Sequence, residues 1–354
     1  MKKHNFSAGP CILPQEVFEQ AAASILNFNN SDLSLIEISH RSADFVQVMD
    51  EAISLVKELL DVPEGYSVLF LQGGASLEFL MVAHNLMKVN GKAAYLDTGS
   101  WSSKAIKEAK LFGEAIVVGS SKDKNYNYIP KNYSIPSDVN YFHCTSNNTI
   151  FGTQIKSFPK TNVSVVCDMS SDIFSQKINI ADFDLIYAGA QKNMGPAGTT
   201  LVIVKDEVLG KTGREIPTML DYRTHIAKES MFNTPPVFAV YVSMLTLRWL
   251  KQNGGIEWIE NINNRKAKLL YDTIDNSSIF EGCANREDRS NMNATFVLNQ
   301  NELEQRFNTL CLENGINGLK GHRSVGGYRA SMYNAMPLES VQTLVDIMND
   351  LENK

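Results

Sequence analysis

Short apolar runs alternate with longer amphipathic stretches through much of the chain, from Tyr66 to Val204. Short apolar runs bounded by turn residues predict buried strands, and apolar residues spaced by three and four positions predict helices. The strands expected on this basis are residues 67–71, 93–96, 115–118, 140–144, 163–167, 184–187 and 200–204. Helical patterns such as 76–87 and 102–111 lie between them. The alternation predicts an α/β fold with a mostly parallel, seven-stranded sheet covered by helices on both faces.

Helical patterns also flank this region, at residues 14–26, 43–60 and 237–250. The last of these is the longest apolar segment in the chain and contains Arg248. It is too short to span a bilayer, so we expect a buried helix and no membrane association.

A second pattern follows the glycine pair Gly254-Gly255, which can end a helix in a left-handed cap. Residues 256–274, 302–314 and 338–351 predict helices, and residues 294–299 and 327–332 predict strands. This mixture favours a smaller α+β unit. We therefore expect an N-terminal arm at 1–14, a large domain at 15–253 and a small C-terminal domain at 254–354.

Composition restricts the function classes. The chain has 354 residues and a formal net charge of -6, with Lys and Arg scattered along it, which disfavours nucleic acid as a partner. Its five cysteines include no Cys-x-x-Cys pair, which indicates reduced thiols in a cytoplasmic compartment and gives no reason to expect a metal site. The first residues lead into no apolar segment, so we expect no secretory signal.

Two charged residues follow consecutive strands, where parallel sheets bind ligands. Lys192 comes after strand 184–187 among small residues, and a desolvated lysine can be the neutral amine that forms a Schiff base with an aldehyde. Taken alone, a solvated loop lysine is the commoner explanation. Asp168 follows strand 163–167, where a buried carboxylate needs a cationic or hydrogen-bonding partner, although it could also cap a helix.

Other strand ends add features that suit a phosphorylated ring. The turn Gly73-Gly74-Ala75-Ser76 opens a helix and can bind phosphate through free N–H groups, but it lacks the third glycine of a dinucleotide fingerprint. Trp101 could stack on a ring or pack in the core. Thr149 could bond a ligand oxygen or cap its turn. Together with Lys192 and Asp168, these features describe a pyridoxal phosphate site.

The motifs that carry a family resemblance are distributed along nearly the whole chain. They are Asn5-Phe6-Ser7-Ala8-Gly9-Pro10, His40-Arg41, Gly73-Gly74-Ala75-Ser76, the block around Lys192, Asn233-Thr234-Pro235-Pro236 and Gly321-His322-Arg323-Ser324-Val325-Gly326-Gly327. On these motifs the chain resembles the phosphoserine aminotransferases. The resemblance implies a fold-type-I, homodimeric pyridoxal phosphate enzyme of serine biosynthesis. It would convert 3-phosphohydroxypyruvate and glutamate into phosphoserine and 2-oxoglutarate, with 4-phosphohydroxythreonine of pyridoxine biosynthesis as an open second substrate.

The resemblance also implies a role for each matching residue. Lys192 would bind the cofactor covalently, Asp168 would pair with its ring nitrogen, Trp101 would stack on the ring and Thr149 would contact the ring oxygen. The residues expected at the cofactor phosphate are Ala75, Ser76 and Gln191, with Asn233 and Thr234 from the other subunit. The residues expected at the substrate are Ser7, His40, Arg41, His322, Arg323 and Arg329, of which Arg329 matches the α-carboxylate arginine. Some family members carry an arginine in the first glycine turn, where this chain has Ala75-Ser76.

Two other functions remain as alternatives. A related cysteine desulfurase needs a reactive cysteine, but neither Cys283 nor Cys311 has the basic or glycine-rich context that lowers a thiol pKa. A related effector sensor needs a DNA-binding segment, and we expect none because the chain shows no basic recognition helix.

Overall fold

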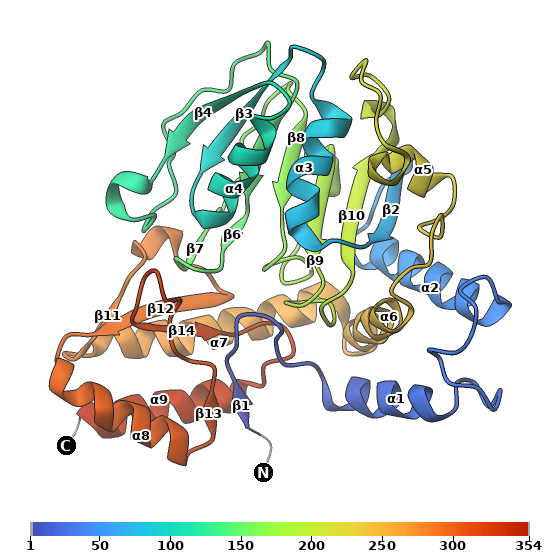
Figure 1. The fold of residues 1–354 in the computed structure, drawn as a ribbon. Coiled ribbons are helices and arrows are strands. Elements are labelled where there is room, and N and C mark those ends of the chain that lie inside the picture. The colour runs from blue at the N-terminus through green and yellow to red at the C-terminus, as the bar shows by residue number, and fades with distance from the viewer. Residues whose placement is uncertain (1–2, 353–354) are drawn as a thin grey trace.

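The computed structural model describes residues 3–352. The first two residues of the expected arm and the last two of the expected C-terminal domain lie outside this range. Figure 1 shows a large upper layer built on one sheet and a smaller lower unit that contains both chain ends.

The large sheet contains all seven strands predicted from the apolar runs. They are β2 (Tyr66–Leu71), β3 (Lys92–Asp97), β4 (Glu114–Ser120), β5 (Phe142–Thr145), β8 (Val165–Asp168), β9 (Leu185–Gly189) and β10 (Thr200–Lys205). Their order is β2-β10-β9-β8-β5-β3-β4. Strand β10 is antiparallel to both of its neighbours, and the other pairs are parallel. The prediction of an α/β fold with a mostly parallel sheet is confirmed.

Helices cover both faces of this sheet. The described helices are α1 (Gln15–Leu26), α2 (Ala43–Leu59), α3 (Gly74–Leu86), α4 (Ser100–Ala109), α5 (Tyr222–Ile226), α6 (Val237–Gln252), α7 (Gly255–Asn276), α8 (Glu304–Glu313) and α9 (Leu338–Glu352). In β9, Tyr187 belongs to the core under α3 and α4, whereas Ile186 and Ala188 belong to the core shared with α2 and α6. This alternation places successive side chains on opposite faces, as a strand covered on both sides requires.

In α6, the charged residue Arg248 pairs with a neighbouring helix. The Arg248 guanidinium makes two hydrogen bonds of 2.7 Å to the Glu51 carboxylate of α2. Within residues 3–352, every helix is too short or too polar to cross a membrane.

The smaller unit has its own antiparallel sheet and core. Its strands are β11 (Phe280–Gly282), β12 (Asn293–Leu298) and β14 (Tyr328–Ser331), packed with α8, α9 and the end of α7. The N-terminal arm joins this unit: β1 (His4–Asn5) pairs with β13 (Ile316–Asn317), and Phe6 is buried in the same core. The short strands β6 (Asn147–Asn148) and β7 (Thr153–Gln154) form a separate hairpin. Short 3₁₀ helices are η1 (Lys122–Lys124), η2 (Ile180–Asp182), η3 (Asp206–Val208), η4 (Thr218–Leu220), η5 (Arg286–Asp288) and η6 (Asn301–Leu303).

Helix α7 begins at the expected domain boundary but contributes to both cores. Ile259 packs in the core of the large sheet, whereas Leu270 and Ile274 pack in the core of the smaller unit. The division into 1–14, 15–253 and 254–354 therefore stays a prediction.

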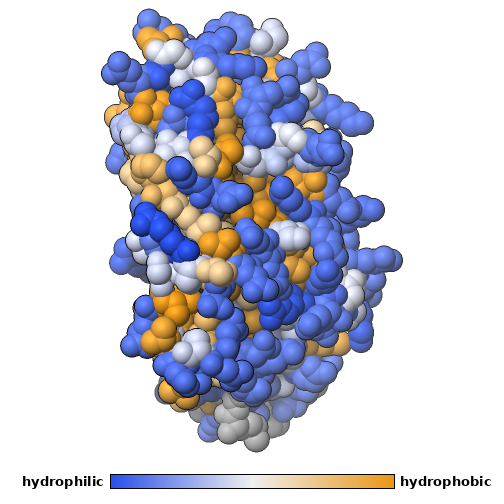
Figure 2. Space-filling model, turned by 90° about the vertical axis from the view of Figure 1, so that its right-hand side faces the viewer, coloured by the Kyte–Doolittle hydropathy of each residue, from blue (hydrophilic) through white to orange (hydrophobic). Residues whose placement is uncertain are grey.

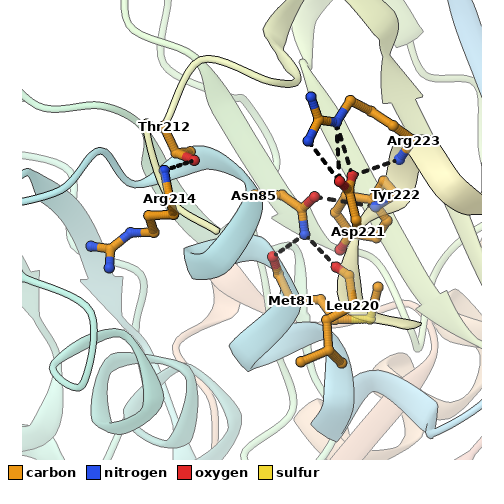
Figure 3. Close-up of polar contacts among 8 residues, drawn as sticks. All are labelled: Met81, Asn85, Thr212, Arg214, Leu220, Asp221, Tyr222 and Arg223. Carbon is orange, nitrogen blue, oxygen red and sulfur yellow. Dashed lines mark hydrogen bonds and ion pairs between the residues drawn. The ribbon is translucent and has the colours of Figure 1, made fainter. Parts of the chain in front are cut away.

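Polar contacts anchor the outer side of α3. The Asn85 side chain donates to the carbonyls of Met81 and Leu220 at 2.8 and 2.7 Å, and its oxygen accepts from the Tyr222 backbone N–H at 3.2 Å (Figure 3). One turn from the helix start, the Tyr222 hydroxyl donates to Glu78. These contacts hold α3, which begins at Gly74, against the segment of η4 and α5.

Glu78 gives the fold a specific pH dependence. Its side chain is fully buried, and burial raises its pKa to about 8 against a smaller opposing effect of the Tyr222 hydrogen bond. The unfolded chain releases this proton near pH 4.5, so the native state binds more protons between about pH 4.5 and 8. Glu78 therefore lowers stability as pH rises through this window. Glu78→Gln should remove that part of the decline, which urea unfolding midpoints between pH 5 and 8.5 would measure.

The exposed Glu257 of α7 offers a matched control. Glu257→Gln should run parallel to the wild type across the same pH range. If Glu78→Gln also runs parallel, Glu78 is ionised in the native state and the interpretation is wrong.

Candidate active site

The ends of several elements bring Lys192 beside Thr149. Lys192 lies three residues beyond β9, and its Nζ donates to the Thr149 hydroxyl at 2.9 Å. Thr149 follows directly after β6 and is buried. Arg329 of β14 donates from Nη1 to the Thr149 carbonyl at 3.3 Å. The large sheet, the β6–β7 hairpin and the smaller unit thus meet at this lysine.

Asp168 is the last residue of β8 and is buried. Its Oδ1 accepts hydrogen bonds from the Ser170 backbone N–H at 2.9 Å and from the Ser170 hydroxyl at 2.6 Å. Burial raises the Asp168 pKa, and the positive charge of Lys192 and the Ser170 hydrogen bonds oppose that rise. The carboxylate therefore has the cationic and hydrogen-bonding partners that its buried position requires.

The electrostatics of Lys192 match the sequence-based expectation. Burial lowers its pKa most strongly, the Asp168 carboxylate opposes this effect, and the nearby Arg329 charge lowers the pKa further. A lowered pKa increases the fraction of neutral amine at neutral pH, and the neutral amine is the nucleophile.

Trp101 lies in the first turn of α4, close to Lys192. The Lys192 ammonium is 5.8 Å from the centroid of the indole. The same side chain packs partly against the core under α3 and α4, so core contact and proximity to Lys192 coexist. Its Nε1 is buried and has no hydrogen-bond partner among residues 3–352.

The glycine turn has the backbone geometry expected of an anion site. Gly73 and Gly74 have φ values of +94° and +66°, and α3 begins at Gly74 without a side-chain cap. A Cβ at Gly74 would meet no atom within 4 Å, so the approach to the turn is open. The first-turn N–H groups of α3, which include those of Ala75 and Ser76, are suited to a phosphate.

The N-terminal arm is hydrogen-bonded to the loop that carries Lys192. The Cys11 backbone N–H donates to the Gln191 carbonyl at 3.2 Å, and the Cys11 thiol donates to the Lys192 carbonyl. The Tyr333 hydroxyl donates to the Ala8 carbonyl at 2.6 Å, which ties the arm to the smaller unit. The arm therefore helps to position the backbone that carries Lys192.

Pyridoxal phosphate fits these residues. The site has a part-buried lysine with a lowered pKa, a buried carboxylate coupled to it, an indole near the lysine and an open helix N-terminus. Two buried donors, Nε1 of Trp101 and Nε of Arg329, have no partner within residues 3–352, which is the pattern expected where a ligand completes a site.

Cationic side chains gather near Arg329. His322 and Arg323 lie in the loop that precedes β14, and the His322 Nδ1 is 2.7 Å from the Ser324 hydroxyl. Burial and the charges of Arg329, Arg323 and Lys104 lower the His322 pKa. Ser7, in the arm, has a backbone N–H that donates to Asn5 at 3.2 Å.

Four predicted site residues are not joined to this group. Arg41 is exposed just before α2, and His40 has a buried Nε2 without a partner in the described chain. The Thr234 carbonyl accepts from the Gln72 side chain at 2.6 Å, which places the Asn233-Thr234 turn beside the glycine turn. Within residues 3–352, no hydrogen bond or ion pair links these four residues to Lys192. Their roles stay predictions, as do those of the other site residues.

Sequence reasoning missed three residues. Ser170 binds Asp168, and a hydroxyl two residues after an aspartate is a recognisable turn pattern that could have indicated it. Cys11 carries no such signal, because its contact depends on how distant segments fold together. The spacing of Lys104, three residues after Trp101 on one helix, could have indicated their contact.

Comparisons with known proteins give a consistent result. The family model described as aminotransferase class-V matches residues 3–344 of the chain. The chain is 71% identical to the phosphoserine aminotransferase of Flavobacterium psychrophilum and 56% identical to that of Porphyromonas gingivalis, with 100% of each chain covered.

Solved structures agree. The phosphoserine aminotransferase of Bacillus circulans subsp. alkalophilus is 45% identical, with 99% of each chain covered and a TM-score of 0.96. The pyridoxal phosphate-bound phosphoserine aminotransferase of Trichomonas vaginalis is 35% identical, with 98% of this chain and 100% of that one covered and a TM-score of 0.93. The chain therefore belongs to the aminotransferase class-V family and, within it, to the phosphoserine aminotransferases.

Proposed function

We propose that the protein is a pyridoxal phosphate-dependent transaminase of serine biosynthesis. It converts 3-phosphohydroxypyruvate and L-glutamate into O-phospho-L-serine and 2-oxoglutarate. The observation that carries the proposal is Lys192, whose Nζ is 2.9 Å from Thr149, lies beside the Trp101 indole and is electrostatically coupled to the buried Asp168. The family membership and the names of its relatives support the choice of substrates.

Each residue around Lys192 has a defined task. When bound, pyridoxal phosphate supplies an aldehyde that condenses with amines and a ring that accepts electrons. Lys192 would hold the cofactor covalently and, as a free amine, would remove the α-proton of the substrate. Asp168 would keep a proton on the ring nitrogen, because a nearby carboxylate favours the charged form of that nitrogen. Trp101 would face the ring, and Thr149 would hold its oxygen.

The phosphate groups and carboxylates are bound by separate donors. The α3 N-terminus binds the cofactor phosphate through Ala75 and Ser76, with Gln191 alongside. Arg329 binds the α-carboxylate common to all the amino acids used, and its contact with the Thr149 carbonyl positions the guanidinium near Lys192. The cations expected at the distal phosphate or carboxylate are His322, Arg323, His40 and Arg41, with Ser7 on the arm.

A homodimer with shared sites would account for the four predicted site residues that have no bond to Lys192 within the described chain: His40, Arg41, Asn233 and Thr234. Seven of the eleven exposed large apolar side chains within residues 3–352 lie in the segments 18–36 and 219–238. They are Phe18, Leu26, Leu33, Ile36, Met219, Phe232 and Phe238. Figure 2 shows apolar patches on the side of the molecule that carries α1, α2 and α5 in Figure 1.

The residues expected from a second copy belong to the same surface. Asn233 and Thr234 lie inside the segment 219–238, and His40 and Arg41 lie four and five residues after Ile36. A second copy that covers this surface would bring those donors to its partner's cofactor and substrate. We accordingly place the protein in the cytoplasm as a homodimer, with no nucleic-acid or membrane partner.

Mixed dimers test the shared site. Chains with Arg41→Ala and chains with Lys192→Ala should each be nearly inactive, because every site in either homodimer lacks one group. Their heterodimer should contain one intact site and recover up to about half of the wild-type kcat per dimer, measured after joint refolding and separation by distinct affinity tags.

A second pair of variants provides the control. Lys192→Ala mixed with Asp168→Asn should recover nothing, because both residues serve the site of their own chain. Equal recovery in the two mixtures, or none in either, would contradict a site shared through Arg41.

The activity itself has a direct test. The purified protein reconstituted with pyridoxal phosphate should show visible cofactor absorbance that changes on addition of glutamate alone. It should also transaminate phosphoserine with 2-oxoglutarate by ping-pong kinetics. A spectrum unaffected by glutamate, or steady turnover of other amino acids in preference to phosphoserine, would overturn the proposal.

A further inference from the structure

We propose that Lys104 is a further specificity-determining residue of this site. Its ammonium adds a positive charge to the distal anion pocket and favours amino acids that carry a phosphate dianion over those that carry a carboxylate. The inference rests on the proposed function, because it concerns how that enzyme distinguishes phosphoserine from glutamate.

Lys104 occupies the rim of the site through its position on α4. It lies three residues after Trp101, so both side chains project from the same face of the helix. The Lys104 Nζ is 4.2 Å from the centroid of the Trp101 indole, and the Lys192 Nζ is 5.8 Å from that centroid. The indole therefore contacts both lysines, and the exposed Lys104 faces solvent at the entrance.

The charge of Lys104 also acts on His322, in the loop that precedes β14. It is one of the three positive charges that lower the His322 pKa, with Arg329 and Arg323. His322, Arg323 and Arg329 belong to the smaller unit, whereas Lys104 belongs to α4, a helix of the large sheet. Cations from both units therefore act on the same imidazole.

These cations have no acidic partners. Within residues 3–352, Lys104, Arg323 and Arg329 take part in no ion pair, although lysines elsewhere, such as Lys92 and Lys251, are paired with carboxylates. Like charges repel, so a group of unpaired cations weakens the native state until an anion binds. The arrangement is therefore suited to a ligand with more than one negative charge.

Coulomb's law states how such a charge discriminates. The interaction energy scales with the product of the charges. Removing the lysine therefore loses about twice as much interaction energy with a dianion as with a monoanion at the same place. A twofold difference in free energy squares the fold-change in affinity. Removing the Lys104 charge should therefore weaken the affinity for phosphoserine by a factor that is the square of the factor for glutamate.

The test compares Lys104→Gln with Lys107→Gln in the holoenzyme. Lys107 is an exposed lysine three residues further along the same helix, and it makes no contact with Trp101 among the described residues. We expect Lys104→Gln to raise the Kd for phosphoserine about fourfold and that for glutamate about twofold, as exposed charge pairs are weak. Lys107→Gln should change neither. Spectral titration of the cofactor measures Kd independently of turnover, and Lys104→Arg should retain both affinities.

The pH dependence separates a charge effect from a packing effect. The second ionisation of a phosphate monoester has a pKa of about 6, so phosphoserine loses its second phosphate charge in more acidic solution. The phosphoserine defect of Lys104→Gln should therefore shrink toward the glutamate defect at about pH 5.5, and it should shrink at high ionic strength. A defect caused by lost contact with the indole would stay constant.

The outcomes distinguish the two proposals. If the wild type binds phosphoserine but Lys104→Gln weakens both ligands equally, or weakens neither, the role of Lys104 is overturned and the proposed function stands. If the wild type itself fails to bind phosphoserine, the proposed function falls, and this inference falls with it.

Discussion

Replacing Lys192 with alanine should lower kcat by about 10⁴-fold or more, since the variant lacks both the covalent attachment point and the proton-transferring amine. The native geometry shows why no neighbour substitutes for it. Two other cations contact the same neighbours: Arg329, whose guanidinium remains protonated, and Lys104, whose ammonium lies over the Trp101 indole. The measurement is single-turnover transamination of phosphoserine.

Two further measurements make this result specific. Lys192→Arg should be as inactive as Lys192→Ala, because it retains a positive charge near Thr149 without a nucleophilic amine. Both variants should keep the wild-type far-ultraviolet circular dichroism. Substantial turnover in either variant would show that another residue performs the chemistry.

The sheet and the reactive centre could be predicted because both depend on local patterns. Each strand of the large sheet is a short apolar run with turn residues at its ends, and its length and flanking residues together identify it. The chemistry follows from topology, since a parallel sheet gathers the residues that follow its strands. Asp168 ends β8 and Lys192 lies just beyond the adjacent strand β9, and the coupling of their charges is a consequence of that order.

Contacts between distant segments could not be predicted in the same way. Strand β1 has two residues and pairs with β13 more than 300 positions away, so its pattern is too short to identify a strand. The Cys11 contact with the Lys192 loop depends on that pairing. Helix α7 illustrates the same limit for domain division, because a continuous amphipathic helix gives no sign that its two halves pack in different cores.

Residues proposed to serve a neighbouring subunit are a third class. The motifs indicate Arg41 and the Asn233-Thr234 turn, and a single chain offers them no bond to Lys192 among the described residues. Their proposed roles require a second copy, and neither periodicity nor composition contains the relative position of two chains.

Replacing Asp168 with asparagine should produce the second large effect, a fall of about 10²-fold or more in the rate of the half-reaction with glutamate. The amide has nearly the shape of the carboxylate and can still accept from Ser170, but it carries no charge to favour a protonated ring nitrogen. Its loss should also lower the Lys192 pKa further, since Asp168 is the main group that raises it. Stopped-flow absorbance with glutamate measures the rate, and cofactor titration should show that binding is retained.

Asp172 provides the matched control for this variant. It is a second buried carboxylate four residues along, hydrogen-bonded to Ser146 and to Gln154, and burial raises its pKa to about 6. Asp172→Asn removes the same charge from a position that lacks the strand-end placement of Asp168, so its half-reaction should slow by far less than that of Asp168→Asn. If the two variants slow the half-reaction equally, the effect comes from the total negative charge near Lys192 and not from the position of Asp168. If Asp168→Asn keeps the wild-type rate, the carboxylate has no part in activating the cofactor ring.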